Sequence, residues 1–292
     1  MKLMNRLMTL MLRRSTGVSA LLAGLGLAAL PVMVSGQSAP DAHADVTPLV
    51  VGETFTIDSP TLGETRTINV YLPASYTADS TARLPVLYMP DGGIGEDFLH
   101  VAGLVQVSVA NGTMRPFILV GIENTARRRD LTGPTTVEDD RKIAPLVGGS
   151  TAFREFIRTE LMPAVRSRYR TTDETAIVGE SLAGLFIVET LLLEPEMFDA
   201  YLAFDPSLWW NGGALVERAT SKMDRLTGKR VYLAASRDDV DSLTRRLAEV
   251  MTAGAPADAI WHYEPMPEER HATIYHPAAL QAFRWAFKPA EE

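Results

Sequence analysis

The sequence predicts an α/β fold in which helices cover both faces of one mostly parallel central sheet. Near-continuous apolar runs of strand length recur along the chain, and such runs are typical of strands that are buried on both faces. Segments with helical spacing separate these runs, so strand and helix alternate along the chain. Functional groups of such a sheet gather at the carboxyl ends of its strands, and we therefore look for chemistry in the loops there.

The expected strands form an antiparallel opening pair and a buried series. Alternating or β-branched residues predict the pair at residues 54–58 and 66–72. Buried strands are expected at residues 84–89, 116–122, 175–178, 200–204 and 229–234, with a further strand at 260–264. Helices are expected at residues 152–169, 182–193, 213–226, 242–251 and 277–287. No linker, repeat or change of composition interrupts this pattern, so residues 45–292 are expected to form one domain.

The first 44 residues differ in kind and are expected to be a cleaved signal peptide. Four basic residues precede an uncharged apolar run at residues 18–34, and small residues follow it. Ala42-His43-Ala44 places small residues at the two positions that a signal peptidase reads, and Val34-Ser35-Gly36 is the alternative cleavage site. The apolar run falls short of the roughly 20 residues that a membrane-spanning helix prefers, so cleavage is favoured over an uncleaved anchor.

The absence of cysteine and the net charge limit the cellular compartments and the binding partners that fit this chain. The chain has no cysteine, which excludes disulfides and a lipid-modified cysteine anchor. Removal of residues 1–44 would leave 24 basic and 35 acidic side chains, a formal charge of −11. Such acidity argues against nucleic acid or anionic lipid as a partner. We expect a periplasmic or secreted protein that acts on a small molecule and has no stable membrane association once processed.

Ser181 lies in the sequence context of a catalytic nucleophile. A short apolar strand precedes it and an apolar helix follows it, so the serine occupies a sharp strand-to-helix turn. Such a turn strains the backbone and needs small residues two positions before and after the serine. Gly179 meets the first requirement, and Ala183 replaces the usual glycine at the second. The Leu182 N–H, at the positive end of the helix, is placed to donate to a developing oxyanion.

A serine hydroxyl needs a base to take its proton, so a histidine from elsewhere in the chain is expected beside Ser181. The fold that carries this turn orders its catalytic residues as serine, acid and histidine. His271 fits this order, because it follows the expected strand at 260–264 after a polar loop and precedes the last helix. The other histidines are less suitable by position, with the last of them as the alternative: His43, His100, His262 and His276.

The acidic partner of the histidine is expected in the loop after the strand at 229–234. This loop contains Asp238, Asp239 and Asp241. A carboxylate here would orient the imidazole and stabilise its protonated form, whereas acids before a helix also commonly cap it. We assign Asp239 as the acid, Asp238 as the alternate and Asp241 as the cap. A serine–histidine dyad without an acid stays open.

Five motifs follow one another within residues 84–211, in a match to a known family that spans roughly residues 50–290: Leu84-Pro85-Val86-Leu87-Tyr88-Met89-Pro90-Asp91-Gly92-Gly93, Gly121-Ile122-Glu123-Asn124-Thr125 with Arg129-Asp130-Leu131-Thr132, Gly179-Glu180-Ser181-Leu182-Ala183-Gly184, Phe198-Asp199-Ala200-Tyr201 and Asp205-Pro206-Ser207-Leu208-Trp209-Trp210-Asn211. Together they resemble the esterase family of the α/β-hydrolase superfamily that includes enterochelin and salmochelin esterases. The sequence departs from that family's pattern at Ala183 and Asp205, where relatives often carry glycine and serine.

The resemblance implies an α/β-hydrolase fold and assigns further residues. It makes the backbone N–H of Gly93 the second oxyanion donor. It also places four side chains around the substrate mouth: Asn124, Arg129, Trp209 and Trp210. Their other interpretations are a capped loop, a surface ion pair and aromatic residues of the core.

We therefore expect a serine carboxylic-ester hydrolase that forms an acyl-enzyme on Ser181, with a siderophore lactone or an acylated sugar among its possible substrates. No metal site or phosphate-binding glycine loop is indicated, so no cofactor is expected. One alternative is an acyltransferase that uses the same site. Another is a catalytically silent homologue that binds its ligand with the tryptophans, although the retained serine, histidine and acids argue against it.

Overall fold

The computed structural model describes residues 47–289. The expected signal peptide lies outside these residues. From Leu49 onward, the described residues group into one compact unit. No helix among the described residues has both the length and the apolar character needed to cross a membrane.

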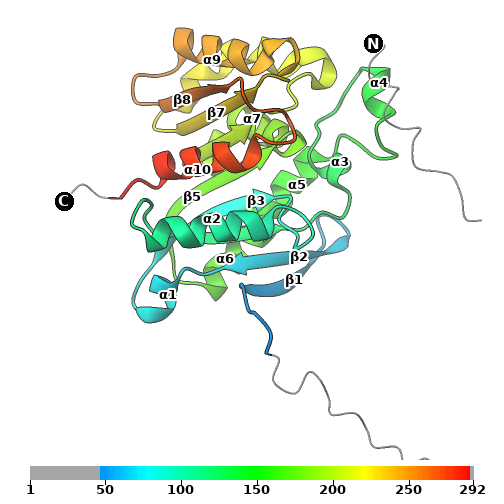
Figure 1. Cartoon of the computed structure of the whole chain (residues 1–292). Coiled ribbons are helices and arrows are strands. Elements are labelled where there is room, and N and C mark those ends of the chain that lie inside the picture. Colours follow the sequence, from blue (N-terminus) through cyan, green and yellow to red (C-terminus); the bar gives the residue numbers. More distant parts are fainter. Residues whose placement is uncertain (1–46, 290–292) are drawn as a thin grey trace, which may run out of the picture. The chain divides into compact units, whose positions relative to one another are not determined.

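A single sheet forms the centre of this unit (Figure 1). In the described part of the chain it has eight strands, in the spatial order β1-β2-β4-β3-β5-β6-β7-β8. Their bounds are Glu53–Ser59 (β1), Glu64–Tyr71 (β2), Leu84–Pro90 (β3), Ile118–Ile122 (β4), Thr171–Glu180 (β5), Ala200–Phe204 (β6), Arg230–Ser236 (β7) and Ile260–Met266 (β8). β1 and β2 pair antiparallel, as do β2 and β4, and every other pairing is parallel. This confirms the expected mostly parallel sheet with an antiparallel opening pair.

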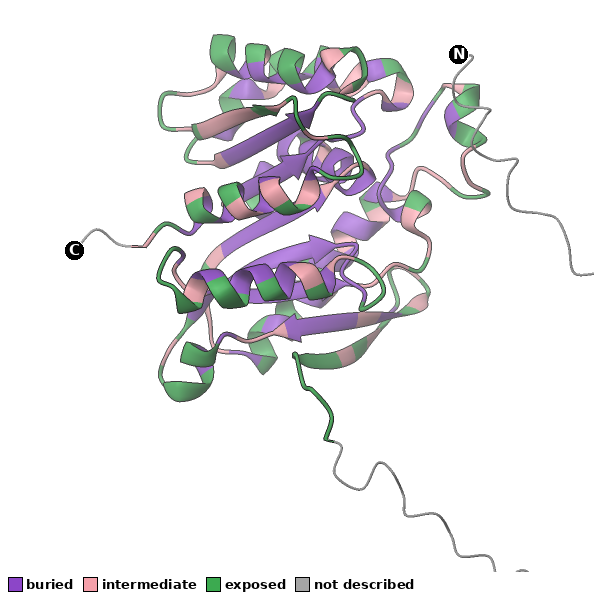
Figure 2. Ribbon diagram, viewed as in Figure 1, coloured by how far each residue is buried: buried purple, intermediate pink, exposed green. Residues whose placement is uncertain are grey.

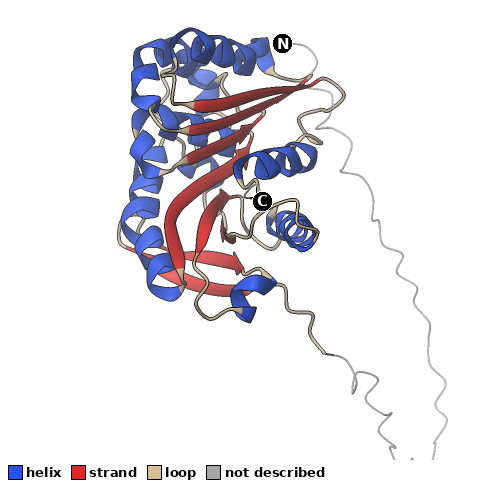
Figure 3. Cartoon of the chain, turned by 90° about the vertical axis from the view of Figure 1, so that its left-hand side faces the viewer, coloured by secondary structure: helices blue, strands red, loops and turns tan. Residues whose placement is uncertain are grey.

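Helices cover both faces of the sheet, as the view turned by 90° shows (Figure 3). The helices are Ala74–Ala78 (α1), Phe98–Ala110 (α2), Arg127–Asp130 (α3), Glu138–Arg141 (α4), Ser150–Phe156 (α5), Met162–Arg168 (α6), Leu182–Leu193 (α7), Ala214–Ala219 (α8), Leu243–Gly254 (α9) and Tyr275–Ala286 (α10). A π-helical turn at Ile157–Leu161 joins α5 to α6. α2 and α10 contact each other on one face, and α5, α6, α7 and α9 pack on the other.

Alternate strand residues feed the two cores. On β3, Val86 and Tyr88 join the core beneath α5, α6 and α7, whereas Leu87 and Met89 join the core beneath α2 and α10. This period of two is the geometry of a pleated strand. The central strands are therefore buried on both faces, which explains their continuous apolar sequences (Figure 2).

The helix α2 is the main element that the sequence pattern missed. Its valines and Gly103 lower intrinsic helix propensity, but burial of Phe98, Val101 and Val105 against the sheet outweighs that preference. The position at which α2 begins depends on a close approach between β4 and the loop after β3. A Cβ on Gly121 would lie 2.7 Å from Phe98 Cδ2 and 2.6 Å from the Gly92 carbonyl oxygen. Glycine at this point lets the loop after β3 settle over the end of β4.

Candidate active site

Ser181 occupies a strained turn between β5 and α7. β5 ends at Glu180 and α7 begins one residue after the serine. The backbone of Ser181 has φ 62° and ψ −121°, a conformation that costs a residue with a side chain about 1–3 kcal/mol. Neighbouring backbone holds it there, because its N–H donates to the Phe204 carbonyl (3.1 Å) and its carbonyl accepts from the Ser207 N–H (3.0 Å).

Small residues permit the close approach of strand and helix at this turn. A Cβ on Gly179 would lie 2.5 Å from the Ala183 Cβ, a distance that non-bonded carbons do not tolerate. Glycine is therefore required two positions before the serine. Ala183 is fully buried and fits because its methyl group occupies the space that Gly179 leaves empty.

His271 contacts the serine through its ring. It lies in the loop between β8 and α10, and its Nε2 is 2.9 Å from Ser181 Oγ. Its backbone N–H donates to the Asp238 carboxylate (3.1 Å), which fixes the loop that carries it. His276, the alternative base, instead contacts His100 across α2 and α10.

Asp205 is the carboxylate that meets the imidazole. Its Oδ2 is 2.6 Å from His271 Nδ1, and its side chain is only 2% exposed. The N–H and the hydroxyl of Ser236 also donate to it, at 2.9 and 2.8 Å. Burial by itself would raise the pKa of this carboxyl, but the bonds from His271 and Ser236 outweigh it and lower the pKa. The hydrogen bond that His271 donates to Asp205 in turn raises the pKa of His271, against the opposing effect of burial.

The expectation that Asp239 or Asp238 orients the imidazole is therefore wrong. Asp239 accepts from the backbone N–H and the hydroxyl of Thr244 (3.2 and 3.0 Å) and so caps α9, the role that had been expected of Asp241. The Asp238 carboxylate accepts from the backbone N–H of His271, and no bond joins it to the imidazole among the described residues. The acid follows β6 rather than β7. The sequence signal for it was Asp205 itself, a carboxylate at a position where relatives often carry serine.

The two expected oxyanion donors differ in whether their N–H groups already have an acceptor. Leu182 is the first residue of α7, where backbone N–H groups have no acceptor within the helix. The N–H of Gly93 donates to Glu96 Oε2 at 2.7 Å, and the other oxygen of that carboxylate accepts from Asn124. A substrate oxygen would have to replace the Glu96 carboxylate to reach Gly93.

Comparison with known proteins identifies the relationship. The profile of the family described as "Putative esterase" matches residues 59–274, most of the chain. The chain belongs to this esterase family. Its family membership makes it an ester hydrolase.

Individual relatives agree in fold and chemistry. The chain is 28% identical over 255 residues to the ferri-bacillibactin esterase BesA of Bacillus subtilis, which covers 77% of this chain and 86% of that protein. It is 33% identical over 192 residues to the siderophore triacetylfusarinine C esterase of Aspergillus fumigatus, covering 59% and 61% of the two chains. The solved structure of an IroE-like serine hydrolase from Shewanella oneidensis matches with a TM-score of 0.71 and 30% identity, over 81% and 80% of the chains. The fold is that of the α/β-hydrolases.

Within this esterase, Asn124 and Arg129 are engaged by neighbouring carboxylates. Asn124 donates to Asp91 as well as to Glu96. Arg129 pairs with Glu64 and with its chain neighbour Asp130, at 2.7 Å each. Burial opposes ionisation of Glu64, but its bonds from Arg129 and other donors lower its pKa to about 2. Any contact of these two side chains with substrate stays a prediction.

The paired tryptophans differ in burial. Trp210 is 4% exposed and donates its indole N–H to the Gly133 carbonyl at 2.9 Å, which fits a core residue. Trp209 is half-buried, with its ring centroid 6.1 Å from that of Trp210. A cavity of about 380 Å³ lies beside Trp210 and Leu185. Substrate binding by either ring stays a prediction.

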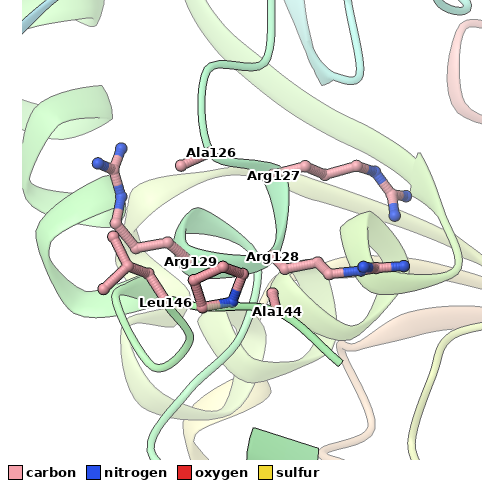
Figure 4. A pocket seen from close by; sticks show the side chains of 7 residues that line it. Ala126, Arg127, Arg128, Arg129, Ala144 and Leu146 are labelled. Atoms are coloured by element: carbon pink, nitrogen blue, oxygen red, sulfur yellow. The ribbon is translucent and has the colours of Figure 1, made fainter. Parts of the chain in front are cut away.

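A second cavity adjoins α3. Its volume is about 470 Å³, and it is lined by Ala126, Arg127, Arg128, Arg129, Ala144, Pro145 and Leu146 (Figure 4). Arg127 and Arg128 extend to one side and Arg129 to the other. Arg127 pairs with Asp91 through two nitrogens, at 2.7 and 2.8 Å, whereas Arg128 donates to the Ile143 carbonyl and has no acidic partner among the described residues.

Substitution of the two aspartates separates their roles. In Asp205→Asn the amide would favour the wrong imidazole tautomer, so turnover should fall by up to about 10⁴-fold with little change in KM. Asp239→Asn is the matched control, with near-normal turnover and a loss of stability of about 1 kcal/mol from a weakened cap. Ester turnover and the unfolding free energy of both variants provide the test. A large turnover loss confined to Asp239→Asn would contradict the assignment.

Proposed function

We propose that this chain is an exported serine esterase that cleaves carboxylic esters through an acyl-enzyme on Ser181. The single observation that carries the proposal is the position of His271, whose two ring nitrogens lie 2.9 Å from Ser181 Oγ and 2.6 Å from Asp205 Oδ2. A base that contacts a hydroxyl on one side and a buried carboxylate on the other is the arrangement that activates a serine.

The steps follow from this geometry. Asp205 accepts a hydrogen bond from the Nδ1–H of neutral His271, which leaves Nε2 free to take the proton of Ser181 as Oγ attacks the ester carbonyl. The protonated imidazole then gives that proton to the departing alcohol. Water, deprotonated by the same nitrogen, attacks the acyl-enzyme and releases the acid.

Backbone N–H groups stabilise the negative charge that forms on the carbonyl oxygen. The Leu182 N–H lies beside the nucleophile and at the positive end of α7. The Gly93 N–H becomes the second donor when the substrate oxygen takes the place of the Glu96 carboxylate. Loss of one such donor typically costs about 10²–10³-fold in turnover.

The names of the relatives favour a siderophore ester as the substrate class. The ferri-bacillibactin and triacetylfusarinine C esterases act on siderophores, and both align with this chain. The cavity beside α3 supports this choice, because it offers room for a bulky group next to Arg128, a cation without an acidic partner among the described residues. An acylated sugar is the second candidate substrate.

Transfer of the acyl group to another alcohol would use the same residues. The half-exposed ring of His271 favours hydrolysis, because solvent reaches the base that must activate the second nucleophile. Product analysis with an added alcohol distinguishes the two reactions. A silent binding protein would retain the fold without turnover.

The decisive variant for this function is Ser181→Ala. It should lower ester hydrolysis by about 10⁶-fold, because the nucleophile and its base act as a unit, while the fold is retained. Hydrolysis of a ferric tris-catecholate trilactone, a hydroxamate siderophore ester and p-nitrophenyl acetate should be measured in parallel. Ser221→Ala, on the exposed surface, is the control and should match the unsubstituted protein. Substantial activity in Ser181→Ala would refute the nucleophile.

Export to the periplasm or the medium is part of the proposal. It rests on the short apolar run at residues 18–34 and the small residues after it. Protein purified from the native envelope should lack at least residues 1–36. Mass spectrometry of the N-terminus tests this, and a Met1 start in the membrane fraction would show an anchor instead.

A further inference from the structure

The residue before the nucleophile, Glu180, places a carboxylate against the same imidazole nitrogen that serves the serine. Its Oε1 is 3.3 Å from His271 Nε2, and its side chain is 18% exposed. Ser181 Oγ lies 2.9 Å from that nitrogen. Two oxygens therefore face one nitrogen that carries at most one proton.

Within residues 47–289, which the structure describes, the Glu180 carboxylate has no bonded partner besides His271. Among the described residues, its one ion pair is with His271, and no hydroxyl, amide or guanidinium donates to it. Four charged groups act on it through space: His271 and Arg127 favour its ionised form, and Asp205 and Asp91 disfavour it. Burial has the largest effect and raises the pKa of Glu180 to about 7. A structural carboxylate would normally be bound by fixed donors, as Asp205 is.

We propose that Glu180 is a positioning residue for proton transfer, whose ionised carboxylate stabilises the protonated form of His271 from the Nε2 side. The proposal rests on the proposed esterase function, since it concerns the base of that reaction. Asp205 and Glu180 then enclose the imidazole between two carboxylates, one at each nitrogen. An imidazolium in this position interacts with both anions, whereas the neutral ring has a proton for Asp205 alone.

The two protonation states of Glu180 have opposite effects on the serine. As an anion, it accepts a hydrogen bond from Nε2–H once the imidazolium has formed, and so lowers the energy of the charged intermediate. As a neutral acid, it can donate its own proton to the Nε2 lone pair and compete with the Ser181 hydroxyl. The ionised form is therefore the active one, and activity falls as the pH drops through the titration of the Glu180–His271 pair.

Glu180→Gln tests this with little change of shape. Loss of the anion should lower the pKa of His271 by about one unit, so the acid limb of kcat/KM moves to lower pH. At high pH, where the base is neutral in both proteins, the plateau should fall by about tenfold. Glu180→Asp, which retains the charge on a shorter side chain, should recover part of the plateau. NMR titration of the His271 ring measures the same pKa without any turnover.

A matched control removes one negative charge from a different place, the loop that carries His271. Glu269→Gln should leave both the His271 titration and the pH profile in place, because that carboxylate contacts Thr273 and not the imidazole. An unchanged His271 titration in folded Glu180→Gln would overturn the proposal, whatever the activity. If the titration shifts in Glu180→Gln but the unsubstituted protein hydrolyses no ester, the proposed function would be refuted and the Glu180–His271 coupling would stand.

Discussion

The candidate site depends on the hydrogen bonds that tie the end of each central strand to the next. The Ser181 N–H reaches back to Phe204 at the end of β6, and the N–H of Asp205 reaches Ala234 in β7 at 2.8 Å. Ser236, at the end of β7, then donates to the Asp205 carboxylate. Because the strands are parallel and adjacent, these bonds fix the relative positions of residues that lie far apart in the sequence. The serine can hold its strained φ only while they are made.

This constraint explains why the acid comes from β6. Asp205 is the first residue after β6, the strand that pairs with the nucleophile's strand β5. Its side chain is buried there, and Ser236 supplies two fixed donors. A carboxylate there is ionised and points at the imidazole. The loop after β7 has a different role, because Asp239 caps α9 and Asp238 anchors the backbone of His271. Asp238 and Asp239, which lie close together in the sequence, thus bind loop and helix backbone, whereas Asp205, which follows a different strand, contacts the base.

Periodicity and turn chemistry predicted most of the fold, and they selected the two residues, Ser181 and His271, whose side chains the structure brings into contact. The catalytic roles of these two residues stay a prediction. The acid could not be chosen that way, since the three aspartates of the loop after β7 look equivalent along the chain, and the pattern does not show that Asp205, after β6, meets the imidazole instead. α2 was missed because packing on the sheet overrode the weak helix propensity of its valines and glycine. The pairing of Arg129 with Glu64 was also beyond reach, because the two residues lie 65 positions apart in the sequence.

The central claim is that His271, bound between Asp205 and Ser181, makes Ser181 a nucleophile. The most direct test is to identify the residue that reacts with a fluorophosphonate. Ser207 provides an internal comparison, because its hydroxyl lies 3.3 Å from that of Ser181 but is not the one that contacts His271. Peptide mass spectrometry after labelling should find a single adduct on Ser181. An adduct on Ser207, or none on a folded protein that hydrolyses esters, would contradict the account.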